Sequence, residues 1–367
     1  MLKKWLTHYR KFNQQQKKLL WFWLLGLSIV FIGYIGYTTF YLYSDKQSEN
    51  KYWSQYLHEK EQLTTSQQKQ AKDAISVSTG VYVENINEIS IRNSNFNVTF
   101  QVWFKWDDHH DLNMLEHYEI YNGQIKSQEI LKESRVGKTN YQLARVNAVV
   151  TKTFWTTRFP LGSYQIRFYL EPKSPIENIV LQADRKNSSI NENINISGFS
   201  VKRFDTNLFV QEYQNNKADP EANGNYTVTE FLTAIELNRE NIGLYIKCFI
   251  ALVGTLGWVL IVLFICTYHN VDPLGMIPSA LFGTVSNILV GANLVPDALH
   301  TGLLEFVNIF GIIVILFSSF AVITINRQRS YYHDDDFAAF FGRHIFWMVA
   351  IFTVAGNILL PMAAYNF

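Results

Sequence analysis

Two rows of side chains run along the apolar segment that includes SALFGTVSNILVGANLVP, residues 279–296, and each row could line a path for water and ions. The first row is apolar and consists of Leu274, Pro278, Leu281, Val285, Ile288 and Ala292. The second row is more polar and consists of Ser279, Gly283, Ser286, Val290 and Asn293. Alternating steps of three and four residues place each row on one face of a helix. On physical grounds alone, we expect the polar row to face water.

A second candidate site is the hexapeptide WDDHHD, residues 106–111. Carboxylates bind Ca²⁺ and, together with imidazoles, Zn²⁺, so Asp107, Asp108 and His109 form a possible metal site. Adjacent residues of a strand point in opposite directions, so only a loop could bring these side chains together. The alternative interpretation is a solvated turn. Beyond modulation by a divalent cation, we expect no cofactor.

Aromatic residues suggest a third site, for a small-molecule agonist. Tyr213 and Tyr226 flank the polar stretch QEYQNNKADPEANGNYTV and could line an aromatic box for a cation. Trp103, within FNVTFQVWFKW, is a further candidate for the same ligand. The alternative is that the two tyrosines lie at strand ends and face solvent.

The composition argues against several classes of function. The chain has 367 residues and a formal net charge of +1, whereas proteins that bind nucleic acid are usually basic. It has no nucleotide-binding loop and no HExxH, GxSxG or paired-cysteine motif, so we expect no enzyme activity. Its two cysteines, Cys248 and Cys266, would lie roughly 27 Å apart on one helix, too far for a disulfide.

The elements that must position these residues begin with membrane segments. The apolar run 19–43 is long enough to cross a membrane and ends in aromatic residues, which favours an uncleaved anchor. Residues 1–18 carry lysines and arginines but no acid, so the positive-inside rule places them in the cytoplasm. A transmembrane domain is predicted over 243–367, with four spans at 243–267, 273–295, 302–326 and 343–364. Alternation then puts the links 268–272 and 327–342 inside and 296–301 outside.

Between the anchor and the other spans the chain is polar. Residues 44–75 are charged and rich in glutamine, which predicts a helical or flexible stalk. Residues 76–242 contain short runs of alternating apolar and polar residues, separated by turn residues. This pattern is typical of an antiparallel β-sandwich with one buried face per sheet. The predicted fold is therefore a membrane protein in which an external β-sandwich is followed by a four-helix transmembrane bundle, with one extra N-terminal transmembrane helix.

This order of elements resembles the pentameric ligand-gated ion channels, the Cys-loop receptor superfamily, and most closely its bacterial members. The resemblance covers about residues 76–365 and is carried by four stretches: GVYVENINEISIRNSNFNVTFQVWFKWDD, RFPLGSYQIRFYLEP, NRENIGLYIKCFIALVGTLGW and NILVGANLVPDALHTG. The second stretch resembles the block that usually reads Phe/Tyr-Pro-Phe-Asp-x-Gln. The fourth resembles the end of the second membrane helix and the loop after it.

The resemblance implies a homopentamer in a bacterial inner membrane, with lipid and an unknown small-molecule agonist as its other partners. Five copies of segment 273–295 would surround one axis, and the family's register selects the apolar row, with Leu281 at a hydrophobic gate. Asp272 would add a carboxylate ring that weakly favours cations, or it would simply cap the helix beside Pro273. Pro278 would be either a tolerated kink or a gating hinge.

The resemblance also implies a coupling interface between the sandwich and the membrane helices. Its candidate residues are Phe159, Pro160, Gly162, Arg239, Asn293 and Pro296. The family's loop cysteines are absent, as in bacterial members, and Gly162 stands where the family has an aspartate that pairs with a pre-membrane arginine, here Arg239. The usual coupling ion pair must therefore be missing or replaced. The N-terminal helix and the altered coupling motif favour an alternative function, a non-conducting membrane-anchored sensor or partner-binding protein that uses the same fold, whereas the intact end of the second membrane helix favours the channel.

Overall fold

The computed structural model describes residues 9–58, 63–214, 226–240, 242–294 and 301–365. These residues fall into two compact units. The first unit contains the chain up to Ser48, the loop Thr156–Gly162 and the chain from Ile242 onward, and the second contains Glu49–Trp155 and Ser163–Asn241.

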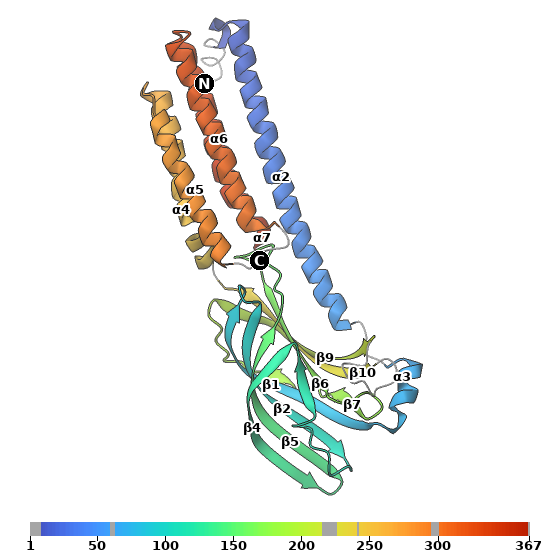
Figure 1. Ribbon diagram of the computed structural model, residues 1–367. Helices are drawn as coiled ribbons and strands as arrows, with labels where there is room; N and C mark the ends of the chain where they lie inside the picture. Colours follow the sequence, from blue (N-terminus) through green and yellow to red (C-terminus); the bar gives the residue numbers. More distant parts are fainter. Residues whose placement is uncertain (1–8, 59–62, 215–225, 241, 295–300, 366–367) are drawn as a thin grey trace. The chain divides into compact units, whose positions relative to one another are not determined.

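The second unit is built on two β-sheets (Figure 1). Sheet A has the strand order β4-β5-β2-β1-β7, with β8 also paired to β1, and sheet B has the order β3-β6-β10-β9. The strands are β1 (Ile75–Ser90), β2 (Asn95–Asp107), β3 (Tyr118–Tyr121), β4 (Gly123–Val136), β5 (Thr139–Thr151), β6 (Tyr164–Pro172), β7 (Ile179–Ala183), β8 (Ser189–Ile190), β9 (Phe199–Tyr213) and β10 (Tyr226–Arg239).

Alternation along the strands explains how the two sheets meet. In β2, Phe96, Val98 and Phe100 are buried, and the residues between them are half-buried. The ring of Phe100 in sheet A lies 4.8 Å from that of Phe168 in β6 of sheet B, so both sheets contribute aromatic residues to the core. The chain thus contains a β-rich region held by an aromatic core, followed by long helices.

Two features of the sheets differ from the sequence prediction. β1 pairs in parallel with β7 and with β8, so sheet A is mixed rather than purely antiparallel. β4 was not predicted, because its residues are mostly exposed and do not alternate. It is an edge strand paired only to β5 within the described residues, and its many polar side chains suit such a position.

Five helices are long and apolar enough to cross a membrane within the part of the chain that the structure describes, which indicates a membrane protein. They are α2 (Gln14–His58), α4 (Gly243–Tyr268), α5 (Ile277–Leu294, preceded by the 3-10 turn η2, Leu274–Met276), α6 (Leu303–Ser330) and α7 (Asp335–Ala364).

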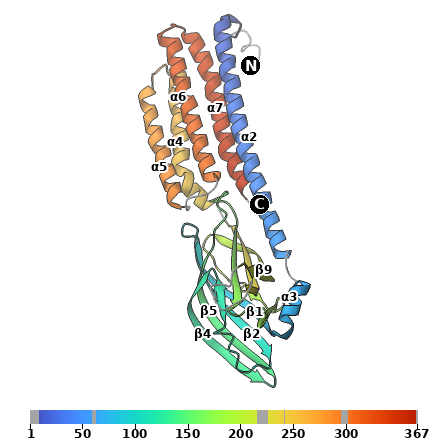
Figure 2. The ribbon, with the colours of Figure 1, turned by 45° about the vertical axis from the view of Figure 1, so that its right-hand side comes forward.

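The first unit packs these helices side by side, and Figures 1 and 2 both place α2 and α5 on opposite sides of the group. Phe31 of α2 is fully buried, and its ring stacks on that of Phe352 in α7 at 5.1 Å. The hydroxyl of Tyr34 in α2 donates to the carbonyl of Phe306 in α6 at 2.8 Å. The N-terminal part of α2 is therefore an integral part of the helix group, not a detached anchor.

Two helices extend well beyond their predicted spans. α2 continues into the predicted stalk, where Trp53 packs on Phe209, Leu232 and Ala234 within the second unit. The rest of the described stalk contains α3 (Thr65–Gln70) and the 3-10 turn η1 (Ala71–Asp73). α7 begins eight residues before the predicted start at 343, because the Asp334 side chain accepts a hydrogen bond from the Phe337 N–H and caps the helix.

Candidate functional site

The apolar row of η2 and α5 is exposed along its whole length. Leu281 is 44% exposed, Val285 53% and Ile288 40%. The other members are exposed as well: Leu274, Pro278 and Ala292. A different face of the helix is buried, and it consists of Ala280, Thr284, Asn287 and Gly291. The chain thus covers one face of α5 and leaves the apolar row open.

A buried amide pair fixes this orientation of α5. Asn287 Nδ2 donates to Asn308 Oδ1 of α6 at 2.8 Å, and Asn308 Nδ2 donates to the Leu304 carbonyl at 2.9 Å. Gly291 lies so close to Leu304 that a Cβ at that position would clash with the leucine side chain. Because a buried amide is costly without a partner, rotation of α5 relative to α6 would be penalised.

The polar row has a different environment. Trp258 Nε1 of α4 donates to Ser279 Oγ at 3.1 Å, and a Cβ at Gly283 would clash with Thr255 Oγ1 of the same helix. Ser279, Ser286 and Asn293 are exposed, and the side chain of Val290 lies outside the described residues. Ser279 and Gly283 of the polar row therefore lie beside α4, whereas the side chains of the apolar row are exposed.

The residues before α5 form the start of the helix. Asp272 Oδ1 accepts from the Leu274 N–H at 3.0 Å and from Asn326 Nδ2 at 2.6 Å. Pro278 lies in the first turn of α5, where a missing N–H leaves no helical hydrogen bond unmade. The carbonyl of Leu274 accepts instead from Ile277, which closes the 3-10 turn. The proline therefore shortens the α-helix at its start rather than kinking its middle.

The loop Thr156–Gly162 belongs to the first unit and lies against the start of α6. The Leu303 N–H donates to the Thr157 carbonyl at 2.8 Å. A Cβ on Gly302 would clash with that same carbonyl oxygen, so the close approach requires glycine. Phe159 and Leu161 of the loop are buried. The loop is thus fixed to the membrane helices through backbone contacts.

Arg158 is the charged residue of this loop, and it is deeply buried, with only 1% of its surface exposed. Its Nε lies 3.4 Å from Asp45 Oδ2 of α2, and its Nη1 donates to the Ala364 carbonyl at 3.3 Å. The carbonyl end of α7 carries partial negative charge, which adds to the carboxylate. Lys46 beside it donates to the Tyr365 carbonyl at 3.2 Å. Asp45 and Arg158 therefore join α2, the loop and the end of α7.

The structure places the other predicted coupling residues as follows. Pro160 and Gly162 are buried in the loop, and the Gly162 N–H donates to the Arg158 carbonyl at 2.8 Å. Arg239 belongs to the second unit, where its guanidinium lies 3.9 Å from the centre of the Phe199 ring. Asn293 is exposed near the end of α5, and Pro296 lies outside the described residues.

Sequence reasoning missed the Arg158–Asp45 pair. Two signals could have suggested it: Asp45 is the first acidic residue of the chain, and Arg158 directly precedes the Phe159–Pro160 step. Neither signal specifies the partner, because the two residues are far apart in sequence.

The predicted aromatic site is only partly assembled. The rings of Tyr213 and Tyr226 lie 6.4 Å apart on β9 and β10, and their hydroxyls donate to Glu171 and to the Lys173 carbonyl, both at 2.9 Å. Burial and the neighbouring Glu171 carboxylate raise the pKa of the Tyr213 phenol. Trp103 lies on β2 in the other sheet, where its Nε1 donates to Asp184 at 3.3 Å.

Among the described residues, no three His, Cys, Asp or Glu side chains gather as metal ligands. Asp107 accepts from Thr139 Oγ1 at 2.6 Å, and Asp108 lies 3.8 Å from Lys138 Nζ. His109 is exposed, and its carbonyl accepts from Trp106. Because the chain turns here, successive side chains diverge, as the solvated-turn alternative predicts.

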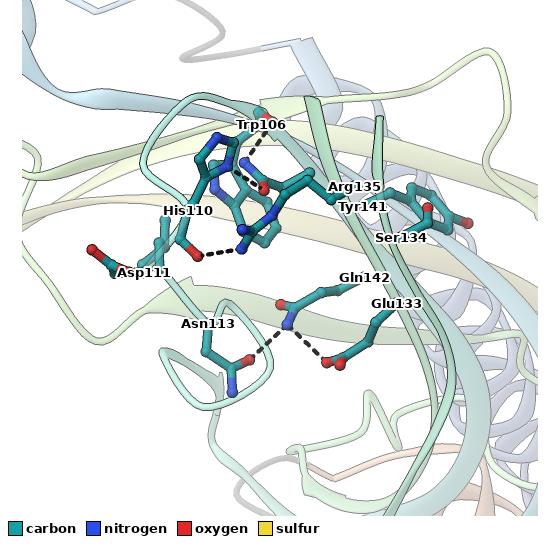
Figure 3. Close-up of a pocket in the computed structure, with 11 residues that line it drawn as sticks. Trp106, His110, Asp111, Asn113, Glu133, Ser134, Arg135, Tyr141 and Gln142 are labelled. Atoms are coloured by element: carbon teal, nitrogen blue, oxygen red, sulfur yellow. Dashed lines mark hydrogen bonds between the residues drawn. The ribbon is translucent and has the colours of Figure 1, made fainter. Parts of the chain in front are cut away.

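A polar cavity of about 360 Å³ lies beside this turn, between the ends of β2, β4 and β5 (Figure 3). Gln142 Nε2 donates to Asn113 Oδ1 at 2.8 Å and to Glu133 Oε1 at 3.0 Å. Arg135 donates to the His110 carbonyl at 2.8 Å. The cavity presents both acidic and basic groups, held by hydrogen bonds to amide and carbonyl groups, which suits a small polar ligand.

Comparison with known proteins gives no match, either to a protein-family model or to a curated protein. The function is therefore inferred from the geometry of the chain itself.

Proposed function

We propose that the chain is one subunit of a homopentameric, ligand-gated ion channel of a bacterial inner membrane. In this proposal the two sheets form its external β-sandwich, and α4 to α7 form its four-helix transmembrane bundle. The observation that carries the proposal is the open apolar row of α5, which includes Leu281, Val285 and Ile288. One helix per chain cannot enclose a pore, so the row needs copies of itself around a closed ring.

The polar residues of α5 support assembly over a solitary subunit in lipid. Ser286 and Asn293 are exposed on the same helix, and polar side chains are unfavourable against hydrocarbon. Neighbouring subunits would cover them. α2 lies on the opposite side of the helix group from α5, so the extra helix leaves the proposed axis unobstructed (Figure 2).

The proposed gate is a hydrophobic ring at Leu281. A narrow apolar constriction excludes water and closes the path, and a small widening allows it to wet. The remaining row contains few polar groups, so we expect low conductance. Asp272 is exposed before the helix and would favour cations weakly, while also capping its start.

The proposed signal acts on the sheets, and the loop Thr156–Gly162 passes movement to the helices. This loop joins β5 to β6 in the chain and contacts the start of α6, directly after the link from α5. The polar cavity beside Gln142 is the candidate ligand site. The basic N-terminus would lie in the cytoplasm and the sheets outside.

The test is purification in detergent, mass determination and reconstitution into liposomes. The proposal predicts a particle of five 42.6 kDa chains and ion flux across a range of pH, Ca²⁺ and amine concentrations. Leu281→Ser should make the channel leak, whereas Ile351→Ser, at an exposed position of α7, should not. A pentamer that conducts under none of these conditions would favour the non-conducting sensor.

A further inference from the structure

The second unit has a cavity that the channel proposal does not use. Its volume is about 320 Å³, within the range of sites for small organic molecules. It is lined by the ends of β3 and β5, by β6 and by the part of α2 that belongs to this unit. The lining residues that matter here are Tyr52, Tyr121, Lys152, Arg167 and Tyr169.

Two cations line this cavity: Lys152, directly after β5 of sheet A, and Arg167 of β6 in sheet B. Arg167 is only 6% exposed, and its guanidinium is stacked beneath the rings of Tyr52 and Trp53, at 5.0 and 5.4 Å from their centres. Its Nη2 donates to Gln165. Burial and the charge of Arg167 lower the pKa of Lys152 to about 8, and Glu49 opposes that shift. Lys152 and Arg167 therefore disfavour each other's positive charge.

The charges around the cavity indicate which charge a bound ligand would carry. Glu49 is 4% exposed and contributes one negative charge near two positive ones. Among Glu49, Lys152 and Arg167, one net positive charge remains in a partly buried space, where electrostatic attraction is stronger than in water. The Lys152 ammonium donates a long hydrogen bond of 3.4 Å to the carbonyl of Thr153, and its other protons can bond a ligand.

The aromatic walls of the cavity indicate the chemical character of the uncharged part of the ligand. Tyr121 and Tyr169 lie edge to face with their ring centres 6.1 Å apart, and Tyr52 contributes a third ring. Such surfaces favour a flat or apolar body, and the phenol hydroxyls add donors. A bare phosphate would leave most of this space unfilled and would bring more than the one negative charge required.

From these observations we propose that the cavity between Tyr52, Tyr121, Lys152 and Arg167 is a binding site for a small organic monocarboxylate. The carboxylate would lie between the Lys152 ammonium and the Arg167 guanidinium, and its apolar body would lie against the tyrosine rings. The site does not depend on the proposed channel activity. The residue Tyr52 of α2 supplies one of its walls.

The test uses benzoate as the probe, with calorimetric titration of the full chain in detergent. Benzoate should bind saturably, while benzylamine and benzyl alcohol, of similar shape but different charge, should not. Lys152→Gln should weaken benzoate binding about tenfold or more, because it removes a charged donor. Lys126→Gln, at an exposed position of β4, is the matched control and should leave binding unchanged.

A second measurement needs no variant. A lysine with a lowered pKa reacts readily with acylating reagents, and bound benzoate should slow acylation of Lys152 but not of Lys126, as read by mass spectrometry. The proposal is overturned if benzoate shows no saturable binding, if benzylamine binds equally well, or if Lys152 is not protected. Equal benzoate affinity in the two lysine variants would overturn it too.

Discussion

Arg158 and Asp45 form a buried ion pair between a loop and the N-terminal helix, with Nε and Oδ2 3.4 Å apart. Their side chains are 2% and 11% exposed. The Ala364 carbonyl accepts a further bond from the same guanidinium. The pair brings a carboxylate of α2 to the loop. The extra helix is thereby connected to the loop that we propose transmits the signal.

Removing one partner of this pair should strongly destabilise the first unit. Arg158→Met and Asp45→Asn should each cost about 3–5 kcal/mol, because the remaining charge stays buried without compensation. The double variant should lose less unfolding free energy than the two single variants lose together. Thermal unfolding in detergent measures the effect. Lys138→Met, which breaks the exposed contact with Asp108, is the control and should cost under about 1 kcal/mol.

The contact between Gly302 and Thr157 should tolerate no side chain. Gly302→Ala should displace the loop, since the Cβ would clash with a backbone carbonyl that also accepts from the Leu303 N–H. We expect a loss of about 1–3 kcal/mol, comparable to other overpacked sites. Hydrogen exchange at Leu303 should speed up. Gly275→Ala, where a Cβ meets nothing within 4 Å, serves as the control. Unchanged exchange in the Gly302 variant would contradict this account.

The buried amides of Asn287 and Asn308 should be coupled. Either single change to leucine leaves the other amide without its partner and should cost about 1–3 kcal/mol. The double leucine variant should recover part of that loss, because both polar groups are gone. A double-mutant cycle on unfolding free energies gives the coupling. Strict additivity of the two single effects would mean that the amides do not hold α5 against α6.

Lys152 should make stability depend on pH in the alkaline range. Its pKa is lowered from 10.5 to about 8 in the folded chain, so the unfolded chain binds more protons between those values. The penalty for the buried charge is therefore present below pH 8 and is relieved as pH rises toward 10.5. Lys152→Gln should be more stable than the natural chain at neutral pH by about 1–3 kcal/mol. This advantage should shrink by pH 10; a constant difference would contradict the assignment.

The sequence predicted the membrane helices well because their signal is local. Each apolar run is continuous, and α4 begins at the predicted residue, Gly243. The acidic stretch before α7 was harder, because a helix cap and a solvated loop use the same residue types. β2 followed from strict alternation, but β4 did not, since an exposed edge strand has no apolar face.

Long-range relationships could not be predicted in the same way. The parallel pairing of β1 with β7 depends on how the chain returns to the sheet, not on either strand alone. The rows of α5 were visible as spacing, but only the packing of Asn287 and Gly283 shows which faces the chain itself covers. The cavity near Arg167 likewise needs α2 to approach sheet B, and no sequence pattern specifies that approach.

The central claim is that the apolar row of α5 lines a shared axis, and a thiol-blocking measurement tests it most directly. Cys248 and Cys266 are first replaced by alanine, and a single cysteine is then introduced at Leu281 or at Ser279. Ion flux through liposomes is recorded before and after a charged, water-soluble thiol reagent. We predict that Leu281→Cys is blocked and that Ser279→Cys, which faces Trp258 of α4, is not. Block at Ser279→Cys alone, or flux that neither cysteine affects, would contradict the account.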